Sequence, residues 1–126
     1  GIAQASLNAS INYSKERIQF GKPISKNQAI QFKISDMAME IESARLLVWK
    51  SAWMKDQKEK FSHLASMAKV YCSEVAMRAS TQCVQIHGGY GYMWEFPIAR
   101  AWADARVQRI YGGTSEIMKE LISRSL

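Results

Sequence analysis

The chain has 126 residues, a formal net charge of +6 and 48% hydrophobic residues. This length suits one domain whose core needs no disulfide or metal ion, and no apolar run approaches the roughly 18 residues or more of a membrane span. Lysine and arginine are interleaved with acidic residues along the chain, so we expect no nucleic-acid partner. A phosphate-bearing small ligand explains the excess charge equally well.

The composition predicts helices. Only two prolines and seven glycines interrupt the chain, and residues of high helix propensity, such as alanine, methionine, lysine and glutamate, dominate. We therefore expect an all-α fold, an antiparallel up-and-down helical bundle of about four to five helices, with residues 1–126 forming one domain.

The first predicted helix covers about Gly1–Ile18 and ends where Phe20-Gly21-Lys22-Pro23 stops the helical pattern. The chain opens within this pattern, so we expect residues to precede Gly1 in the parent protein. The positions that recur at helical spacing are Ile2, Ala5, Ala9 and Tyr13.

A capping box formed by Ser25 and Gln28 predicts the start of the second helix, which runs to about Met54. The charged segment Lys55–Lys60 is expected to be a solvated loop. The apolar positions of this helix are Ile30, Ile34, Met37, Ile41, Ala44 and Val48.

The third predicted helix begins at Ser62, ends at Gly88-Gly89 and packs closely on the second helix through small residues. Cys72 and Cys83 lie about three turns apart on it, so they cannot easily bridge each other. We interpret them as reduced, buried apolar residues of an intracellular or organellar protein. The apolar stripe of this helix is Ala65, Ala68, Cys72, Val75, Ala79, Cys83 and Ile86.

Two shorter helices complete the predicted bundle. Pro97 suits the first position of a helix that runs toward Tyr111. A last helix begins at Thr114 and carries Ile117, Met118, Leu121 and Ile122.

Three segments contain residues that packing alone does not require. The first is Glu16–Gly21, in which Arg17, Gln19 and Phe20 could grip a phosphate beside a flat heterocycle. The alternative is a helix-capping arginine with Phe20 beneath it.

The second segment is Gln85–Tyr92, in which three glycines allow close approach of a backbone or a ligand. Gly88 and Gly89 could equally form a helix C-cap, although the neighbouring tyrosines favour a contact surface. His87 has no second ligand at metal spacing, so we expect a hydrogen-bonded or solvent-edge histidine and no metal site.

The third segment is Arg109–Met118, in which Gly112 and Gly113 expose the backbone before a helix start at Thr114. Free amides and the helix dipole favour an anion there. An ordinary N-cap explains the same residues.

Together, the motifs ERIQFGKPI, QIHGGYGY and IYGGTSEI resemble the C-terminal helical domain of the acyl-CoA dehydrogenases over essentially the whole chain. Among the branches of this family, the sequence of these motifs looks most like the long-chain branch. The resemblance implies an FAD-dependent oxidation of a fatty acyl-CoA to its trans-2-enoyl-CoA, with an electron-transfer flavoprotein as partner and a homo-oligomer, dimer or tetramer. It implies the cytoplasm for a bacterial protein and the mitochondrial matrix for a eukaryotic one.

The resemblance also implies roles for individual residues. Arg17, Gln19 and Phe20 resemble residues that hold the pyrophosphate and adenine side of FAD, joined by Asn27 and Gln28. A second segment resembles the one that reaches the cofactor of a neighbouring subunit, and a third resembles the flavin contact, with Gly113 near the thioester. The second segment is Gln85, Ile86, His87, Gly88 and Gly89, and the third is Thr114, Ser115 and Glu116.

Gly112 departs from many members of the family, in which a glutamate at this position is the catalytic base. In the long-chain and isovaleryl branches a glutamate on the preceding helix takes this role, and it would lie upstream of Gly1. We therefore expect no catalytic residue and no complete active site in this chain, and we do not expect Glu116 or Glu95 to substitute as the base. The alternative is a stand-alone helical oligomerisation module that has lost flavin binding.

Overall fold

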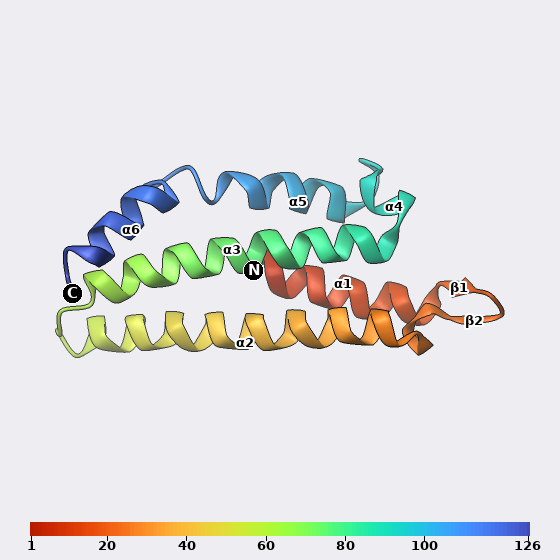
Figure 1. Cartoon of the computed structure of the whole chain (residues 1–126), viewed down its shortest axis with the longest axis horizontal. Helices are drawn as coiled ribbons and strands as arrows, with labels where there is room; N and C mark the ends of the chain where they lie inside the picture. Colours follow the sequence, from red (N-terminus) through yellow and green to blue (C-terminus); the bar gives the residue numbers. More distant parts are fainter.

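A computed structural model describes residues 1–126, and it confirms the all-α bundle. Figure 1 shows the helices lying side by side along one long axis. The elements in chain order are α1 (Ile2–Glu16), β1 (Ile18–Gln19), β2 (Lys22–Pro23), the 3₁₀ turn η1 (Ile24–Lys26), α2 (Gln28–Asp56), α3 (Ser62–His87), α4 (Gly89–Tyr92), α5 (Pro97–Val107) and α6 (Ser115–Ser123).

Helix α3 is the centre of the bundle, because it contacts α1, α2, α4, α5 and α6. In Figure 1, α2 lies on one side of α3, and α5 and α6 together cover the other side. The predicted bounds of α3 are confirmed, and small residues let its neighbours pack closely. The buried apolar core consists of Leu7, Ile24, Met37, Ile41, Ala44, Val75, Ala79, Cys83, Ile86 and Ile98.

Helix α1 buries serines where the sequence pattern predicted alanine. Ala5 is exposed, whereas Ser6, Leu7, Ser10 and Ser14 are buried. The Ser10 hydroxyl donates to the Ser6 carbonyl at 2.8 Å, which lets a polar side chain enter the core without an unpaired donor. The pattern is wrong at Ala5, whereas Ala9 and Tyr13 pack against the core. A serine such as Ser10, bonded to its own helix, can occupy a core position because it is small.

A short hairpin, rather than a plain helix stop, connects α1 to α2. β1 pairs with β2 in antiparallel register, with Ile18 opposite Pro23. Phe20 and Gly21 form the turn with φ angles of 50° and 76°, the combination that a two-residue hairpin turn requires. Helix α1 therefore ends at Glu16, short of the predicted Ile18.

The predicted capping box at Ser25 is wrong. Residues Ile24–Lys26 form the 3₁₀ turn η1, and α2 begins only at Gln28. Asn27 is the N-cap residue of α2, with no side-chain cap hydrogen bond. The Ser25 carbonyl instead accepts a hydrogen bond from Gln31 Nε2 at 3.0 Å.

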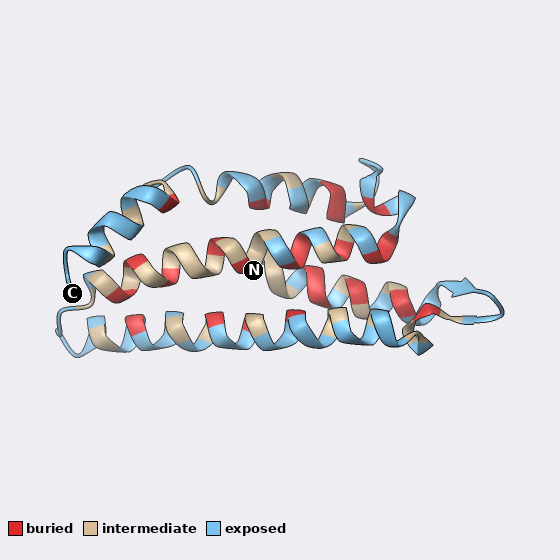
Figure 2. Cartoon of the chain, in the orientation of Figure 1, coloured by how far each residue is buried: buried red, intermediate tan, exposed pale blue.

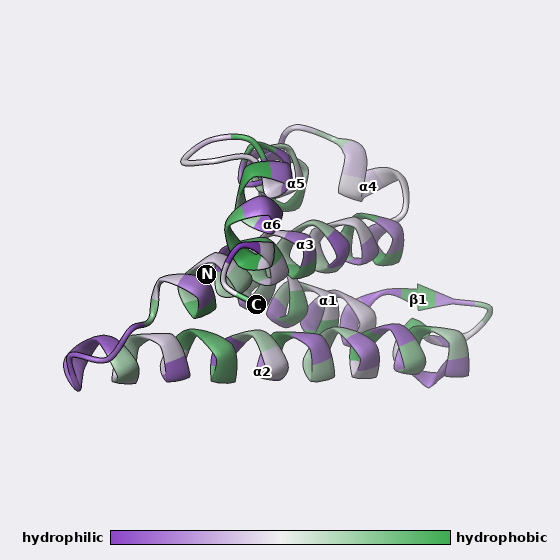
Figure 3. Ribbon diagram, turned by 60° about the vertical axis from the view of Figure 1, so that its left-hand side comes forward, coloured by the Kyte–Doolittle hydropathy of each residue, from purple (hydrophilic) through white to green (hydrophobic).

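Helix α2 leaves one face outside the bundle, which Figure 2 shows as an almost continuous exposed band. Its buried positions include Met37, Ile41 and Ala44, whereas Val48 is exposed, against expectation. Hydrophobic and hydrophilic turns alternate along this helix in Figure 3. None of the helices combines the length and the apolar character that crossing a bilayer requires.

The last two helices join through a glycine turn. Helix α5 ends at Val107, short of the predicted Tyr111. Helix α6 begins at Ser115 behind Thr114, whose hydroxyl accepts a hydrogen bond from the Ile117 amide at 3.3 Å. The predicted N-cap is confirmed, whereas no sequence pattern predicted the one-turn helix α4.

Candidate functional site

A cavity of about 460 Å³ lies where the end of α1, the hairpin, the end of α3 and α4 meet. We call it the hairpin cavity. It brings together two of the three predicted motif segments, which are far apart in the sequence. Its lining residues are Tyr13, Arg17, Gln19, Ile24, Ile86, His87, Gly88, Gly89, Tyr90 and Met93.

Tyr13 and His87 join α1 to α3 at the base of this cavity. Their rings stack with centroids 4.1 Å apart, and the Tyr13 hydroxyl donates to the His87 carbonyl at 3.3 Å. His87 is buried, and its Nδ1 lies 2.8 Å from the Cys83 carbonyl, so Nδ1 carries a proton and donates. The expectation of a hydrogen-bonded histidine is confirmed.

Arg17 gives the hairpin cavity its positive charge. Its guanidinium carbon lies 5.6 Å from the centroid of the Tyr90 ring, a cation–π distance. No carboxylate pairs with Arg17, and no acidic residue lines the cavity. The N–H donors of this guanidinium are therefore available to bind an anion.

The glycines of the second segment have two different roles. Gly88 ends α3 with a φ of 61°, and open space surrounds the position of a Cβ at both Gly88 and Gly89. At Gly91, a Cβ would lie only 2.4 Å from the Val84 carbonyl oxygen. Gly91 thus lets α4 touch α3, whereas Gly88 and Gly89 leave backbone open toward the cavity.

Several predicted cofactor residues lie outside this cavity. Phe20 stands at the hairpin tip with 98% of its surface exposed, rather than beneath Arg17. Gln85 is exposed on α3, while Asn27 and Gln28 begin α2. None of these four residues lines the hairpin cavity.

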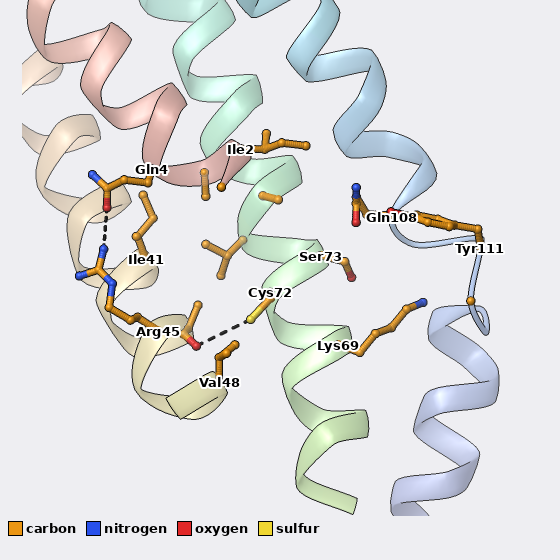
Figure 4. Close-up of a pocket in the computed structure, with 16 residues that line it drawn as sticks. Ile2, Gln4, Ile41, Arg45, Val48, Lys69, Cys72, Ser73, Gln108 and Tyr111 are labelled. Carbon is orange, nitrogen blue, oxygen red and sulfur yellow. Dashed lines mark hydrogen bonds between the residues drawn. The ribbon is translucent and has the colours of Figure 1, made fainter. Parts of the chain in front are cut away.

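The third segment lies elsewhere, beside a larger hollow between α1, α2, α3 and the α5–α6 turn. We call this hollow of about 770 Å³ the central groove. Gly112 lines it, together with Lys69, Cys72, Gln108 and Tyr111, which Figure 4 shows. Gly112 and Gly113 have φ angles of 63° and 96°, and the space around Gly112 is open.

Charged side chains of α3 hold this turn. The Lys69 ammonium donates to the Gly113 carbonyl. Arg109 Nε lies 2.8 Å from a Glu74 carboxylate oxygen, an ion pair without hydrogen-bond geometry. The Ser115 amide closes the turn by donating to the Arg109 carbonyl at 3.1 Å.

Glu116 is unsuited to act as a base. Hydrogen bonds from its own backbone amide and from the Thr114 hydroxyl lower the pKa of its carboxyl group. The carboxylate therefore stays ionised and binds a proton weakly. The cysteines are free, as expected, and burial raises the pKa of both the Cys72 and the Cys83 thiol, which lowers their reactivity.

Sequence reasoning missed Tyr13 and Met93 as lining residues and Lys69 as a support of the glycine turn, and it expected Tyr90 only as part of a contact surface. Tyr13 and Tyr90 were visible as aromatic residues near the motifs, but only the packing of α1 on α3 shows what they contact. Nothing in the sequence around Lys69 distinguishes it from a surface lysine.

Comparison with known proteins agrees with these features. Residues 1–126 match the family model "Acyl-CoA dehydrogenase, C-terminal domain". The chain is 55% identical over 126 residues to a probable acyl-CoA dehydrogenase, YngJ, of Bacillus subtilis (strain 168), covering 100% of this chain and 33% of that protein. It is 49% identical over 126 residues to the mitochondrial short-chain specific acyl-CoA dehydrogenase of Homo sapiens, covering 100% of this chain and 31% of that protein.

A solved structure, butyryl-CoA dehydrogenase from Megasphaera elsdenii, superposes with a TM-score of 0.97 at 48% identity, covering 98% of this chain and 32% of that one. The chain thus spans about a third of the length of the proteins it matches. The human relative is a short-chain enzyme, so it gives no support to the expected likeness to the long-chain branch. On its sequence and its fold, this chain belongs to the acyl-CoA dehydrogenase family, of which it is a C-terminal domain.

Proposed function

We propose that this chain serves an FAD-dependent acyl-CoA dehydrogenase that converts a fatty acyl-CoA to its trans-2-enoyl-CoA. In this proposal the domain supplies part of the FAD site and an oligomer interface. The observation that carries the proposal is the meeting of Arg17 and Gln19 with His87, Gly88 and Gly89 in one cavity.

The residues of the hairpin cavity fit the diphosphate portion of FAD. Arg17 offers an unpaired guanidinium for a phosphate, and the open backbone at Gly88 and Gly89 leaves room for close approach. Gln19 can hydrogen-bond a phosphate or a ribose. Phe20, exposed at the hairpin tip, offers a ring for stacking on adenine.

The start of α6 is proposed as a contact to a different FAD molecule. Thr114, Ser115 and Glu116 lie beside the central groove, away from the hairpin cavity, and the two hollows share no lining residue. Figure 1 shows the α5–α6 turn well separated from the hairpin. This separation supports a cofactor shared between neighbouring subunits, one using the α6 start and the other the hairpin cavity.

The catalytic base is proposed to come from outside residues 1–126. FAD, when bound, supplies the acceptor for a hydride from the β-carbon, while a carboxylate takes the proton from the α-carbon. Gly112 has no side chain, and Glu116 is a weak base for the reason given above. The turn at Gly112 and Gly113 would instead position the backbone beside the thioester. An electron-transfer flavoprotein would be the partner that receives the electrons.

The outer face of α2 supports the proposed homo-oligomer. Five large apolar side chains on it are each more than half exposed, and four of them follow one another at seven-residue intervals. Such an interval places side chains in one line, as in the seam between paired helices. A second copy of this chain offers a matching face. These side chains are Phe32, Met39, Leu46, Trp49 and Trp53.

Titration with FAD tests the cofactor role. We expect FAD to raise the melting temperature of the chain, and Arg17→Ala to weaken the apparent affinity about 10-fold or more, because a charge-assisted hydrogen bond is lost. Arg106→Ala is the matched control, since Arg106 is an exposed arginine on α5 outside both hollows. Equal affinities of the two variants would contradict the assignment of Arg17.

The stand-alone oligomerisation module remains the second candidate, and the apolar outer face of α2 favours it as much as it favours the enzyme. The FAD titration separates the two, because a module that has lost flavin binding shows no thermal shift with FAD. An activity assay tests the expectation that the chain lacks a complete active site. With butyryl-CoA or palmitoyl-CoA and an artificial electron acceptor, we expect no turnover by this chain above a protein-free blank.

A further inference from the structure

The turn between α5 and α6 is held by a contact that its own sequence does not provide. Gly112 and Gly113 have no side chains, and both have left-handed backbone angles, so neither residue restrains the turn by itself. The Lys69 side chain crosses from the N-terminal third of α3 and donates to the Gly113 carbonyl. Figure 4 shows it pointing toward this turn, beside Tyr111.

The two sides of the turn differ. Around Gly113, a Cβ would lie 2.3 Å from Met118 Cε, so Met118 covers this residue. Around Gly112 there is open space, and this residue lines the central groove. The turn is therefore fixed by Lys69 and Met118 on one side and presents bare backbone on the other.

The charge of Lys69 needs an explanation. No carboxylate lies within ion-pair distance of its ammonium group, and none lines the central groove. The nearby N-terminus of α6 also carries partial positive charge. A neutral donor could hold a carbonyl with less electrostatic repulsion, so structural support alone does not account for a lysine here.

We propose that Lys69 is a positioning residue. By holding the Gly113 carbonyl, it fixes the direction in which the backbone of Tyr111–Thr114 meets an anionic ligand at the start of α6. The identification of that ligand as FAD rests on the function proposed above. The restraint of the turn by Lys69 does not depend on which ligand binds there.

The test compares three variants of the chain. Lys69→Met removes the donor and keeps the length, and Lys69→Arg keeps a charged donor. Lys33→Met is the matched control, because Lys33 is another partly buried lysine, bonded to Gln82 on α3 at 2.6 Å and remote from the turn. Hydrogen exchange of the segment 110–117 is measured by mass spectrometry, and FAD affinity by thermal shift.

We expect Lys69→Met to speed exchange in the segment 110–117 by about 10-fold or more, with α1 and α2 unchanged. Lys69→Arg should recover most of the protection, and Lys33→Met should match the parent chain in this segment. FAD affinity should fall about 5- to 10-fold in Lys69→Met only. If Lys69→Met does not fold, Lys69→Leu, which also lacks a donor, takes its place.

Unchanged exchange in Lys69→Met, or an equal rise in all helices, would overturn the positioning role. A loosened turn with unchanged FAD affinity would overturn its link to the ligand. If the parent chain itself does not bind FAD, the proposed function fails, and the exchange data still decide whether Lys69 fixes the turn.

Discussion

At the scale of single residues, Gly112 and Gly113 differ in what surrounds them, although both have positive φ angles. Gly112 faces open space, whereas Gly113 lies under Met118. An L-residue in the left-handed region costs about 1 to 2 kcal/mol, so both positions favour glycine. Only at Gly113 does a neighbouring side chain, that of Met118, give a second, steric reason for glycine.

We predict that Gly112→Ala lowers the free energy of unfolding by about 1 to 2 kcal/mol. Gly113→Ala should lower it further, because Met118 must move. In a Met118→Ala background this extra loss should disappear. Urea unfolding of the four variants measures both effects, and an equal loss for the two glycines in the parent background would contradict the prediction.

Glu116 makes stability depend on pH. Its pKa is lower in the folded chain than the ordinary value of 4.5, chiefly through the hydrogen bond from its own backbone amide and that from Thr114. The stabilisation is therefore complete above about pH 4.5 and is lost as the pH falls through the folded pKa. Glu116→Gln should flatten the fall in melting temperature between pH 5 and pH 3, measured by circular dichroism. Glu95→Gln, in the segment before α5, serves as the control and should leave the slope intact.

At the scale of elements, the serines of α1 show where sequence patterns mislead. Ser6, Ser10 and Ser14 are buried against the bundle, yet an apolar–polar pattern counts them as surface. Their small volume allows close packing of α1 on α3. The position of the hairpin cavity depends on that packing, because Tyr13 and His87 meet across it.

We predict that Ser10→Val destabilises the chain by about 1 to 3 kcal/mol, since added methyl groups overfill a packed interface. Asn12→Val, on the exposed side of the same helix, introduces the same side chain and should cost less. Chemical denaturation of both variants measures the difference. A loss at Asn12 as large as that at Ser10 would show that helix propensity, not packing, is responsible.

The helices themselves were largely predictable. Periodic apolar positions and glycine and proline stops located α2, α3, α5 and α6, and Thr114 marked the start of α6. The hairpin was not predictable, because its turn uses Phe20 at a φ of 50°, which sequence rules reserve for glycine or asparagine. The capping box failed because a 3₁₀ turn took up the same residues.

The candidate site was predictable only in part. Arginine and glycine motifs located the segments of both hollows, because a guanidinium can bind an anion and glycines allow close approach of a ligand. The partners Tyr13 and Lys69 could not be found, because they act across 74 and 44 residues of sequence. Only tertiary packing decides such pairs.

At the scale of the whole molecule, the outer face of α2 is the surface through which we expect the chain to self-associate. A line of large apolar side chains this exposed favours association. We predict that the chain forms a dimer or tetramer and that Leu46→Lys together with Trp53→Lys shifts it to monomer. Light scattering after size exclusion measures the mass.

Asn12→Lys, on the exposed side of α1, adds the same kind of charge outside this face and should leave the assembly unchanged. A monomeric parent chain at high concentration would refute the prediction, as would an assembly that tolerates both lysines.

Helix α3 borders both hollows: Lys69 and Cys72 belong to the central groove, and Ile86 and His87 to the hairpin cavity. An α-helix advances about 1.5 Å and rotates about 100° per residue. The stretch of α3 from Lys69 to Ile86 therefore sets a distance of about 25 Å between the two hollows. It also sets the angle between the directions in which they face. Deleting one residue within it would barely change their separation, yet it would swing one hollow by more than a quarter turn relative to the other.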